Sequence, residues 1–219
     1  ALSLWLTEQG IDHDRIFADT GWEHPELYSY LDYLNERVFD GQLVKVKSKK
    51  YPNGMTDLVR GRGMFPSRLF RFCTQELKIF PIRDYIHELR DRHPDLDVPV
   101  NAVGIRAAES RARSALDEWE PGSILAKRKK DGHLCDTWRP LITWVVSDVV
   151  DIHSRHAIPP CPLYLREQLP ASRVGCWPCI MSKKDEIRAV VETDPERMDL
   201  IRQLEADVKA KAAARYAAK

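Results

Sequence analysis

Apolar residues recur along the chain at two spacings, one typical of strands and one typical of helices. Short apolar or β-branched runs predict strands at residues 14–18, 43–46 and 98–105. Stretches with apolar residues three or four positions apart predict helices at residues 1–9, 24–38, 55–62, 74–93, 147–156, 184–191 and 195–216. Ser147 is expected as the N-cap of its helix, with Asp148 in the first turn. Strands that alternate with helices predict an α/β fold, with a parallel sheet covered by helices on both faces.

Two polar segments follow predicted strands directly. Asp19-Thr20-Gly21 comes after the strand at 14–18, and Gly104-Ile105-Arg106 closes the run at 98–105. Ligands of open parallel sheets bind outside the carboxyl ends of the strands. We therefore expect both segments to contribute to a ligand site.

The composition is that of a globular protein. Of 219 residues, 43% are hydrophobic and 31% are charged, and the formal net charge is +1. No stretch approaches the roughly 18 apolar residues needed to span a bilayer, and no signal peptide is found, so we expect a cytoplasmic protein without a membrane partner. Basic residues cluster at 45–50, 106–113 and 127–130, and the first and third clusters are interpreted as solvated faces. Residues 126–132 are expected to form a loop.

The five cysteines point to metal or redox chemistry, because an odd number without a secretory signal disfavours a disulfide framework. Cys176 and Cys179 are two residues apart, so both thiolates can face one metal. Cys73 and Cys161 could complete a four-cysteine site for a [4Fe–4S] cluster or for zinc. Spacing alone leaves alternatives open. Cys176 and Cys179 could be a redox pair, and Cys135, interpreted as a free thiol, could replace Cys161.

Several segments, taken in order, resemble the phosphoadenosine phosphosulfate (PAPS) reductase superfamily, which is related to the N-type ATP pyrophosphatases. The matching segments are 17–26 (FADTGWEHPE), 73–78 (CTQELK) with Pro81 after it, 103–113 (VGIRAAESRAR), 140–149 (PLITWVVSDV), 162–164 (PLY) and 172–179 (SRVGCWPC). The resemblance implies the adenine nucleotide alpha hydrolase-like fold, with a parallel sheet flanked by helices. It also implies two parts, a nucleotide-binding α/β core at 1–155 and a segment at 156–219 that carries the cluster-binding loop and the C-terminal helices.

The resemblance implies an adenine nucleotide as ligand, either ATP or a sulfonucleotide, with Mg²⁺ as a candidate companion. The arginines would bind phosphates, since guanidinium groups hold them bidentately, and the segment after the first strand would contact nucleotide or magnesium. The expected nucleotide-binding residues are Asp19, Thr20, Gly21, Lys78, Gly104, Arg106, Glu109, Arg111 and Arg113.

The loop at 172–179 is similar to the cluster-binding loop of the DNA phosphorothioation sulfurtransferases and to the Cys-x-x-Cys of adenylyl-sulfate (APS) reductases. In both groups the cysteines bind a [4Fe–4S] cluster. In the reductases an adjacent cysteine pair occupies the position of Cys73, whereas Phe72 precedes it here. The resemblance implies [4Fe–4S] rather than zinc. The expected ligands are Cys73, Cys161, Cys176 and Cys179.

Two departures from the superfamily bear on function. Its Ser-Gly-Gly-x-Asp-Ser phosphate loop would precede Ala1, and we interpret its absence as trimming relative to the natural protein. The C-terminal Cys-Gly nucleophile of sulfonucleotide reductases has no counterpart after Cys179. The resemblance thus favours an ATP-dependent sulfurtransferase of the ATP pyrophosphatase type, which activates its substrate by adenylation, with a sulfur donor protein and nucleic acid as candidate partners. The alternatives are an APS or PAPS reductase of sulfate assimilation and a non-catalytic, cluster-bearing subunit.

Overall fold

The computed structural model describes residues 1–95, 97–122, 134–165 and 174–217. They form two compact units, and each unit combines two separate stretches of the chain. The first unit contains Ala1–Arg15 and Ile82–Pro160, and the second contains Ile16–Pro81 and Cys161–Lys219. The predicted division at residue 155 stays a prediction. The predicted loop at 126–132, which includes the basic cluster at 127–130, lies outside the described residues.

The first unit is built on a three-stranded sheet. Its strands are β3 (Val100–Ala102), β4 (Trp119–Glu120) and β5 (Asp136–Trp138), in the order β3-β5-β4. β5 runs parallel to β3 and antiparallel to β4. The predicted parallel pairing is thus present between β3 and β5, and β4 adds an antiparallel strand at the edge of the sheet. The predicted strand at 98–105 is shorter than expected, because only three of its residues pair.

Helices α1 (Leu2–Glu8) and α6 (Val146–Arg155) pack together in the first unit. Glu8 joins them, since its carboxylate accepts hydrogen bonds from Arg155 Nη2 at 2.9 Å and from His156 Nε2 at 2.8 Å. The predicted N-cap of α6 was wrong. The cap residue is Val145, whose N–H donates to the Asp148 carboxylate at 2.7 Å, so the first-turn aspartate caps the helix and the predicted serine lies inside it.

The second unit contains the strand pair β1 (Arg15–Ala18) and β2 (Leu43–Val46), with α2 (Pro25–Arg37) between them in the chain. The Asp19 N–H donates to the Val46 carbonyl at 2.9 Å, so the carboxyl ends of the two strands lie side by side. α2 begins where the sequence predicts, because the His24 ring accepts a hydrogen bond from the Glu26 N–H at 3.1 Å and Pro25 occupies the first helical position.

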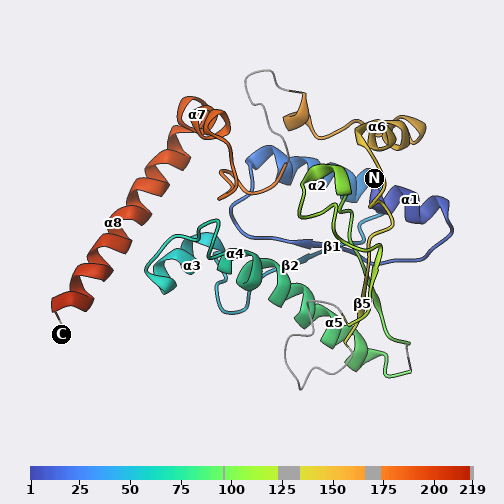
Figure 1. Cartoon of the computed structure of the whole chain (residues 1–219), viewed down its shortest axis with the longest axis horizontal. Coiled ribbons are helices and arrows are strands. Elements are labelled where there is room, and N and C mark those ends of the chain that lie inside the picture. The colour runs from blue at the N-terminus through green and yellow to red at the C-terminus, as the bar shows by residue number, and fades with distance from the viewer. Residues whose placement is uncertain (96, 123–133, 166–173, 218–219) are drawn as a thin grey trace. The chain divides into compact units, whose positions relative to one another are not determined.

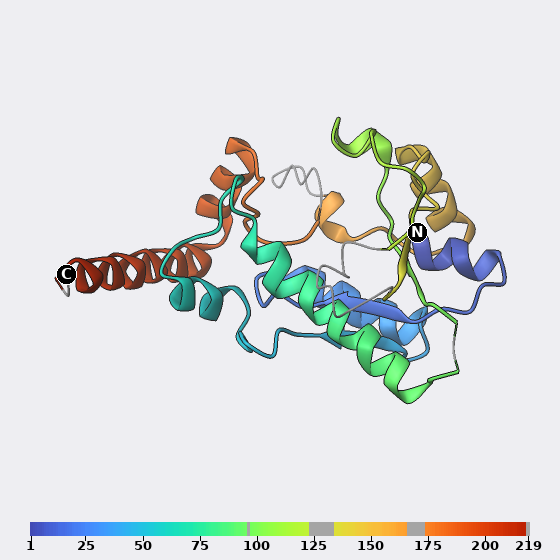
Figure 2. The ribbon, with the colours of Figure 1, turned by 60° about the horizontal axis from the view of Figure 1, so that its bottom comes forward.

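The other helices of the second unit pack around two apolar clusters. They are α3 (Met55–Arg62), α4 (Phe72–Thr74), the π-helix η1 (Gln75–Ile79), the 3₁₀-helix η4 (Pro162–Tyr164), α7 (Lys184–Thr193) and α8 (Pro195–Ala217). Leu58, Leu77 and Leu204 are fully buried and join α3, η1 and α8. α8 packs against α3 and α7 in both ribbon views (Figures 1 and 2). The predicted helix at 74–93 consists of two elements: its first turns form the π-helix η1, and the α-helix α5 (Phe80–Arg92) follows directly.

The predicted α/β class is confirmed, since helices accompany strands that include the parallel pair β3 and β5. The described strands belong to two sheets, one in each unit. In the part of the chain that the structure describes, no helix is both long enough and apolar enough to cross a membrane.

Candidate functional site

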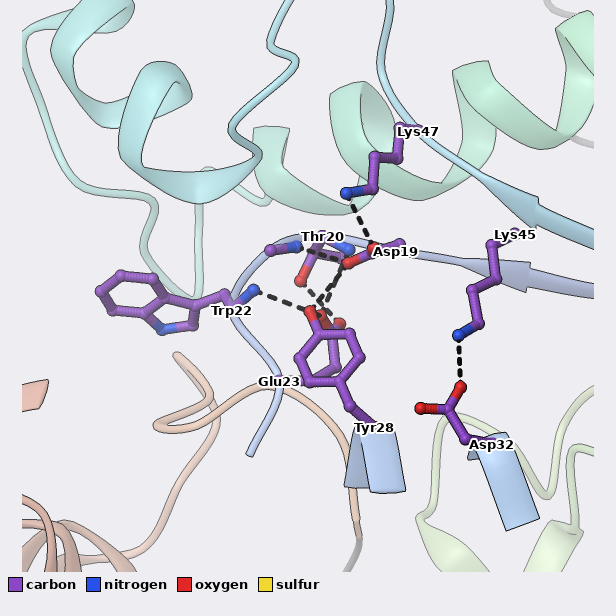
Figure 3. A network of polar contacts seen from close by, with 9 residues as sticks. Asp19, Thr20, Trp22, Glu23, Tyr28, Asp32, Lys45 and Lys47 are labelled. Atoms are coloured by element: carbon purple, nitrogen blue, oxygen red, sulfur yellow. Dashed lines mark hydrogen bonds and ion pairs between the residues drawn. The ribbon is translucent and has the colours of Figure 1, made fainter. Parts of the chain in front are cut away.

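The segment Asp19-Thr20-Gly21 follows β1, as predicted, and its first two residues are almost completely buried, while Gly21 is exposed. Asp19 is 7% exposed, Thr20 is 1% exposed and nearby Glu23 is 2% exposed. Buried polar groups are costly unless hydrogen bonds replace their lost water. Figure 3 shows that these side chains turn toward one another and form a connected network.

Glu23 is the centre of this network. Its Oε1 accepts a hydrogen bond from the Thr20 hydroxyl at 2.6 Å, and its Oε2 accepts from the backbone N–H groups of Thr20 and Trp22, each at 3.2 Å (Figure 3). The sequence analysis did not select Glu23. The Thr-x-x-Glu spacing of Thr20 and Glu23 is a sequence signal that could have found it, because this pairing recurs where a side chain satisfies free backbone donors.

Asp19 is held by three donors at the end of β1. Its carboxylate accepts from the Gly21 N–H at 2.9 Å and from the Tyr28 hydroxyl at 2.8 Å, and it pairs with Lys47 Nζ at 3.1 Å. Burial alone would raise the pKa of Asp19, but these three donors outweigh it and hold the pKa below its ordinary value. The Tyr28 hydroxyl also lies 2.9 Å from Glu23 Oε2. Burial and the two carboxylates strongly raise the pKa of Tyr28, so its proton stays in place to bridge them.

Thr20 is also fixed through its backbone carbonyl, which accepts the Met55 N–H at 2.9 Å. This bond requires a close approach at Gly54, where a Cβ atom would lie only 1.8 Å from the Thr20 carbonyl oxygen. Gly54 has φ +65°, a conformation that glycine adopts at little cost. The start of α3 therefore contacts the backbone of Asp19-Thr20-Gly21 directly, and we call these residues the strand-end segment.

The Cys176 loop pairs with the same segment. Glu23 and Cys176 form an isolated antiparallel bridge, and the Trp177 N–H donates to the Trp22 carbonyl at 2.7 Å. The Thr20 hydroxyl oxygen lies 3.9 Å from Cys176 Sγ, at the outer limit of a hydrogen bond to sulfur. The two predicted elements, the strand-end segment and the Cys-x-x-Cys loop, thus meet in one place.

Three predicted thiols and Lys78 influence one another electrostatically. Burial raises the pKa of Cys73 and of Cys176, and in both cases the Lys78 ammonium opposes the increase. Cys179 raises the pKa of both thiols through its negative charge when ionised. Cys73 and Cys176 pack against the same apolar core. Lys78 is therefore placed to stabilise negative charge on sulfur.

Cys161 lies in a different apolar cluster, with Leu163 and Ala189, and Trp177 packs against this cluster. Cys135 is fully buried and belongs to the first unit. Among the described residues, no group of three or more His, Cys, Asp or Glu side chains is arranged to hold a metal ion as it stands. The four-cysteine ligand set stays a prediction.

The predicted arginine segment lies in the first unit, just after β3. The 3₁₀-helix η2 (Ala107–Glu109) follows Arg106 there, and the Ala107 N–H donates to the Ile142 carbonyl at 2.8 Å. Glu109 forms ion pairs with Arg113 and, at 3.6 Å, with Arg106. The buried Nη1 of Arg106 has no hydrogen-bond partner among the described residues, so this guanidinium keeps an unused donor. Gly104 and Arg111 belong to the same segment.

Residues 3–182 match the phosphoadenosine phosphosulfate reductase domain. The chain belongs to this family. The relationship confirms the predicted resemblance to the PAPS reductase superfamily, whose members are enzymes that bind adenine nucleotides.

Relatives of this PAPS reductase-family chain are found in a phage and an archaeon. An uncharacterized 37.8 kDa protein of Escherichia phage 186 is 31% identical over an alignment 250 positions long, which covers 94% of this chain and 71% of that protein. An uncharacterized protein of Methanocaldococcus jannaschii is 24% identical over 195 residues, which cover 89% of this chain and 36% of that protein.

The fold of the PAPS reductase-family chain is similar to the crystal structure of a PAPS reductase from Candida auris in complex with phosphate. The TM-score is 0.55, the sequence identity is 19%, and the match covers 81% of this chain and 76% of the other. At this identity the similarity concerns the fold alone.

We expect Gly54→Ala to displace Thr20, because the added Cβ would collide with the Thr20 carbonyl. The matched control is Gly41→Ala, since Gly41 also has positive φ (+78°) but has nothing within 4 Å of the added atom. The control should lose about 1–2 kcal/mol of unfolding free energy from backbone strain alone. Gly54→Ala should lose about 3–5 kcal/mol, measured by urea unfolding, because overpacking adds to the strain. Equal losses would show that α3 does not press on the segment.

We expect Asp19→Asn to destabilise the protein at pH 7 and to matter progressively less in acid. The folded pKa of Asp19 lies below its unfolded value, so the carboxylate stabilises the fold above about pH 4 and loses this effect as the pH falls through the folded pKa. The cost at pH 7 should be about 1–3 kcal/mol, measured by thermal unfolding between pH 7 and pH 3. Asp32→Asn is the control. Asp32 also pairs with a lysine, Lys45 at 2.7 Å, but is 61% exposed and should contribute little at any pH (Figure 3).

Proposed function

We propose that this chain is an ATP-dependent sulfurtransferase of the ATP pyrophosphatase type. The observation that carries the proposal is the contact between the two predicted elements, with the Thr20 hydroxyl 3.9 Å from Cys176 Sγ. A nucleotide bound at the end of β1 would lie beside sulfur, and this is what an enzyme needs when it activates a substrate with ATP and then transfers sulfur to it.

The first half of the proposed reaction is adenylation. An oxygen of the acceptor attacks the α-phosphorus of ATP, the bond to the β,γ-phosphates breaks, and pyrophosphate leaves. Negative charge builds up on the phosphates, and arginine guanidinium groups stabilise such charge. Arg106 is the first candidate among the predicted arginines, because its buried Nη1 has no hydrogen-bond partner among the described residues. Arg113 and Arg111 are the further candidates in the same segment.

The strand-end segment supports nucleotide binding by its shape. Gly21 has φ +62° and Asp19 accepts its N–H, so the backbone turns sharply at the end of β1. The Asp19 carboxylate is already engaged by three donors, including Lys47. A carboxylate that already accepts three donors is poorly suited to bind magnesium. We therefore assign Asp19 the role of shaping the turn.

The thiols fit a [4Fe–4S] cluster in their chemistry, since thiolates are its usual ligands and Lys78 offsets their negative charge. Cys73, Cys176 and Cys179 would hold it, with Cys161 as the proposed fourth ligand. Support for Cys161 comes from Trp177, which packs against the Cys161 cluster and follows Cys176 directly in the chain. When bound, such a cluster supplies thiolate-ligated iron that can bind sulfur.

The residue beside Cys73 favours sulfur transfer over sulfonucleotide reduction. The APS reductases resembled by the Cys loop carry a second cysteine at this position, and this chain carries Phe72. The Phe72 ring packs against the core of the second unit, and the Arg62 guanidinium lies 5.4 Å from its centre. Phe72 is therefore a packing residue at the position where those reductases have a cysteine. The resemblance of the loop to DNA phosphorothioation sulfurtransferases makes nucleic acid a candidate acceptor and a sulfur donor protein a candidate partner.

The function is tested by anaerobic incubation of the protein with labelled ATP, APS and PAPS, with and without an acceptor. We expect pyrophosphate to be released from ATP and no sulfite to form. Arg106→Met should slow the release by about 100- to 1,000-fold, since removal of one donor that stabilises transition-state charge has effects of this order. Sulfite from APS or PAPS would instead identify a reductase. No product from any of the three nucleotides would leave a non-catalytic, cluster-bearing subunit.

The cluster is tested by the iron content and visible absorbance of anaerobically purified cysteine variants. Cys176→Ala should lose the iron, and Cys161→Ala should lose it as well if Cys161 is the fourth ligand. Cys135→Ala is the matched control, because Cys135 is a fully buried thiol of the other unit and should be dispensable. Zinc in place of iron would overturn the cluster assignment. If Cys135→Ala loses its iron and Cys161→Ala keeps it, the choice of Cys161 as the fourth ligand is overturned.

A further inference from the structure

Arg197 lies in the first turn of α8, outside the region that matches the family. Its guanidinium carbon is 4.4 Å from the centre of the Trp22 ring, within the range of a cation–π interaction. Its Nη2 donates to the Glu23 carbonyl at 3.3 Å. The Arg197 side chain is only 13% exposed, so both interactions take place largely away from water.

The two residues that Arg197 contacts are those that pair with the Cys176 loop. The Trp22 carbonyl accepts the Trp177 N–H at 2.7 Å, and the Trp22 indole donates to the Pro178 carbonyl at 3.2 Å. Glu23 forms the bridge with Cys176. Arg197 therefore supports the strand-end segment on one side while the loop pairs with it.

Asp194 connects the same helix start to the loop from the other direction. Its carboxylate accepts the Trp177 indole N–H at 3.0 Å and the Arg197 backbone N–H at 2.9 Å. Asp194 Oδ2 is 4.0 Å from Arg197 Nε, a long separation for an ion pair. Asp194 is thus engaged mainly by Trp177 and by the backbone, and the charge of Arg197 is only partly neutralised.

Burial lowers the pKa of Arg197, while Asp194, Glu23 and Cys176 raise it through their negative charge. Guanidinium nevertheless stays protonated in proteins, so Arg197 contacts Trp22 and Glu23 as a cation.

We propose that Arg197 is a positioning residue of the sulfur site, which clamps Trp22 and Glu23 against the Cys176 loop. This inference rests on the proposed function for its chemical meaning, but the clamp itself can be tested without any activity. α8 is then part of the functional site, although it lies beyond the family match.

The clamp is tested by backbone amide exchange at Trp177, followed by NMR or mass spectrometry in the intact chain. Arg197→Met removes the charge and the donor, and we expect Trp177 exchange to rise by about tenfold, as loss of a partly buried cation–π contact and a hydrogen bond implies. Arg197→Lys keeps the charge and should fall between wild type and Arg197→Met. The control is Arg60→Met, which removes a different contact of α8, the 2.7 Å ion pair with Asp207, and should leave Trp177 exchange unchanged.

Arg197→Met should also lower sulfur transfer by about tenfold, because a Cys176 loop that is less firmly held positions its thiol less well. The two proposals fail differently. If Trp177 exchange rises equally in Arg197→Met and Arg60→Met, or in neither, the clamp is overturned whatever the enzyme does. If exchange rises only in Arg197→Met but ATP gives no pyrophosphate, the clamp stands and the proposed function fails.

Discussion

A carboxylate that is removed from water must recover its lost hydrogen bonds, and Glu23 does so with the Thr20 hydroxyl, two backbone N–H groups and the Tyr28 hydroxyl. An unpaired buried charge would cost several kcal/mol, so these donors must all be in place when the segment folds. The geometry of the segment after β1 therefore depends on this one side chain. The backbone of Glu23 then carries the bridge to Cys176 and accepts the Arg197 guanidinium, so the same residue links the strand end, the thiol loop and α8.

The donors around Glu23 leave the Thr20 hydroxyl with a defined direction. Its proton points to Glu23 Oε1 at 2.6 Å, so the oxygen presents lone pairs toward Cys176. The Lys78 ammonium opposes the rise in the pKa of Cys176, so this cation favours negative charge on the sulfur. Lys78 lies in the π-helix η1, whose wider turn changes the face on which each following side chain lies relative to an α-helix. Such irregular turns often occur at functional sites, which agrees with the place of η1 directly after Cys73.

Much of the fold followed from periodicity, because it depends on which face of an element is buried. β2 and α3 begin and end at the predicted residues, α2 differs from prediction by one residue at each end, and α8 differs by one residue at its C-terminal end only. β4 has two residues and β5 has three, which is too few for an alternating pattern, so neither was predicted. The π-helix was missed because its spacing differs from 3.6 residues per turn. The predicted cap Ser147 was wrong because an acceptor at the third helical position serves equally well.

The candidate site could be predicted only where a local motif carried it. Asp19, Thr20 and Cys176 belong to short motifs, and the structure brings them into one network. Arg197 has no such motif, since its contacts with Trp22 and Glu23 join residues more than 170 positions apart and only the folded chain reveals them.

The C-terminal helices could be taken for an appendage, because the family match ends at residue 182. Their contacts argue against this. Leu204 of α8 is fully buried in the same core as Trp22, and Asp194, which precedes α8, binds the Trp177 indole. A helix whose removal would expose the core, free the Cys176 loop and remove a buried cation is part of the site's construction. The long polar remainder of α8 is a different matter, since its contacts with α3, such as the ion pair between Arg60 and Asp207, are exposed and contribute little by themselves. The first turns of α8 therefore help to build the site, and the remainder of the helix only extends from them.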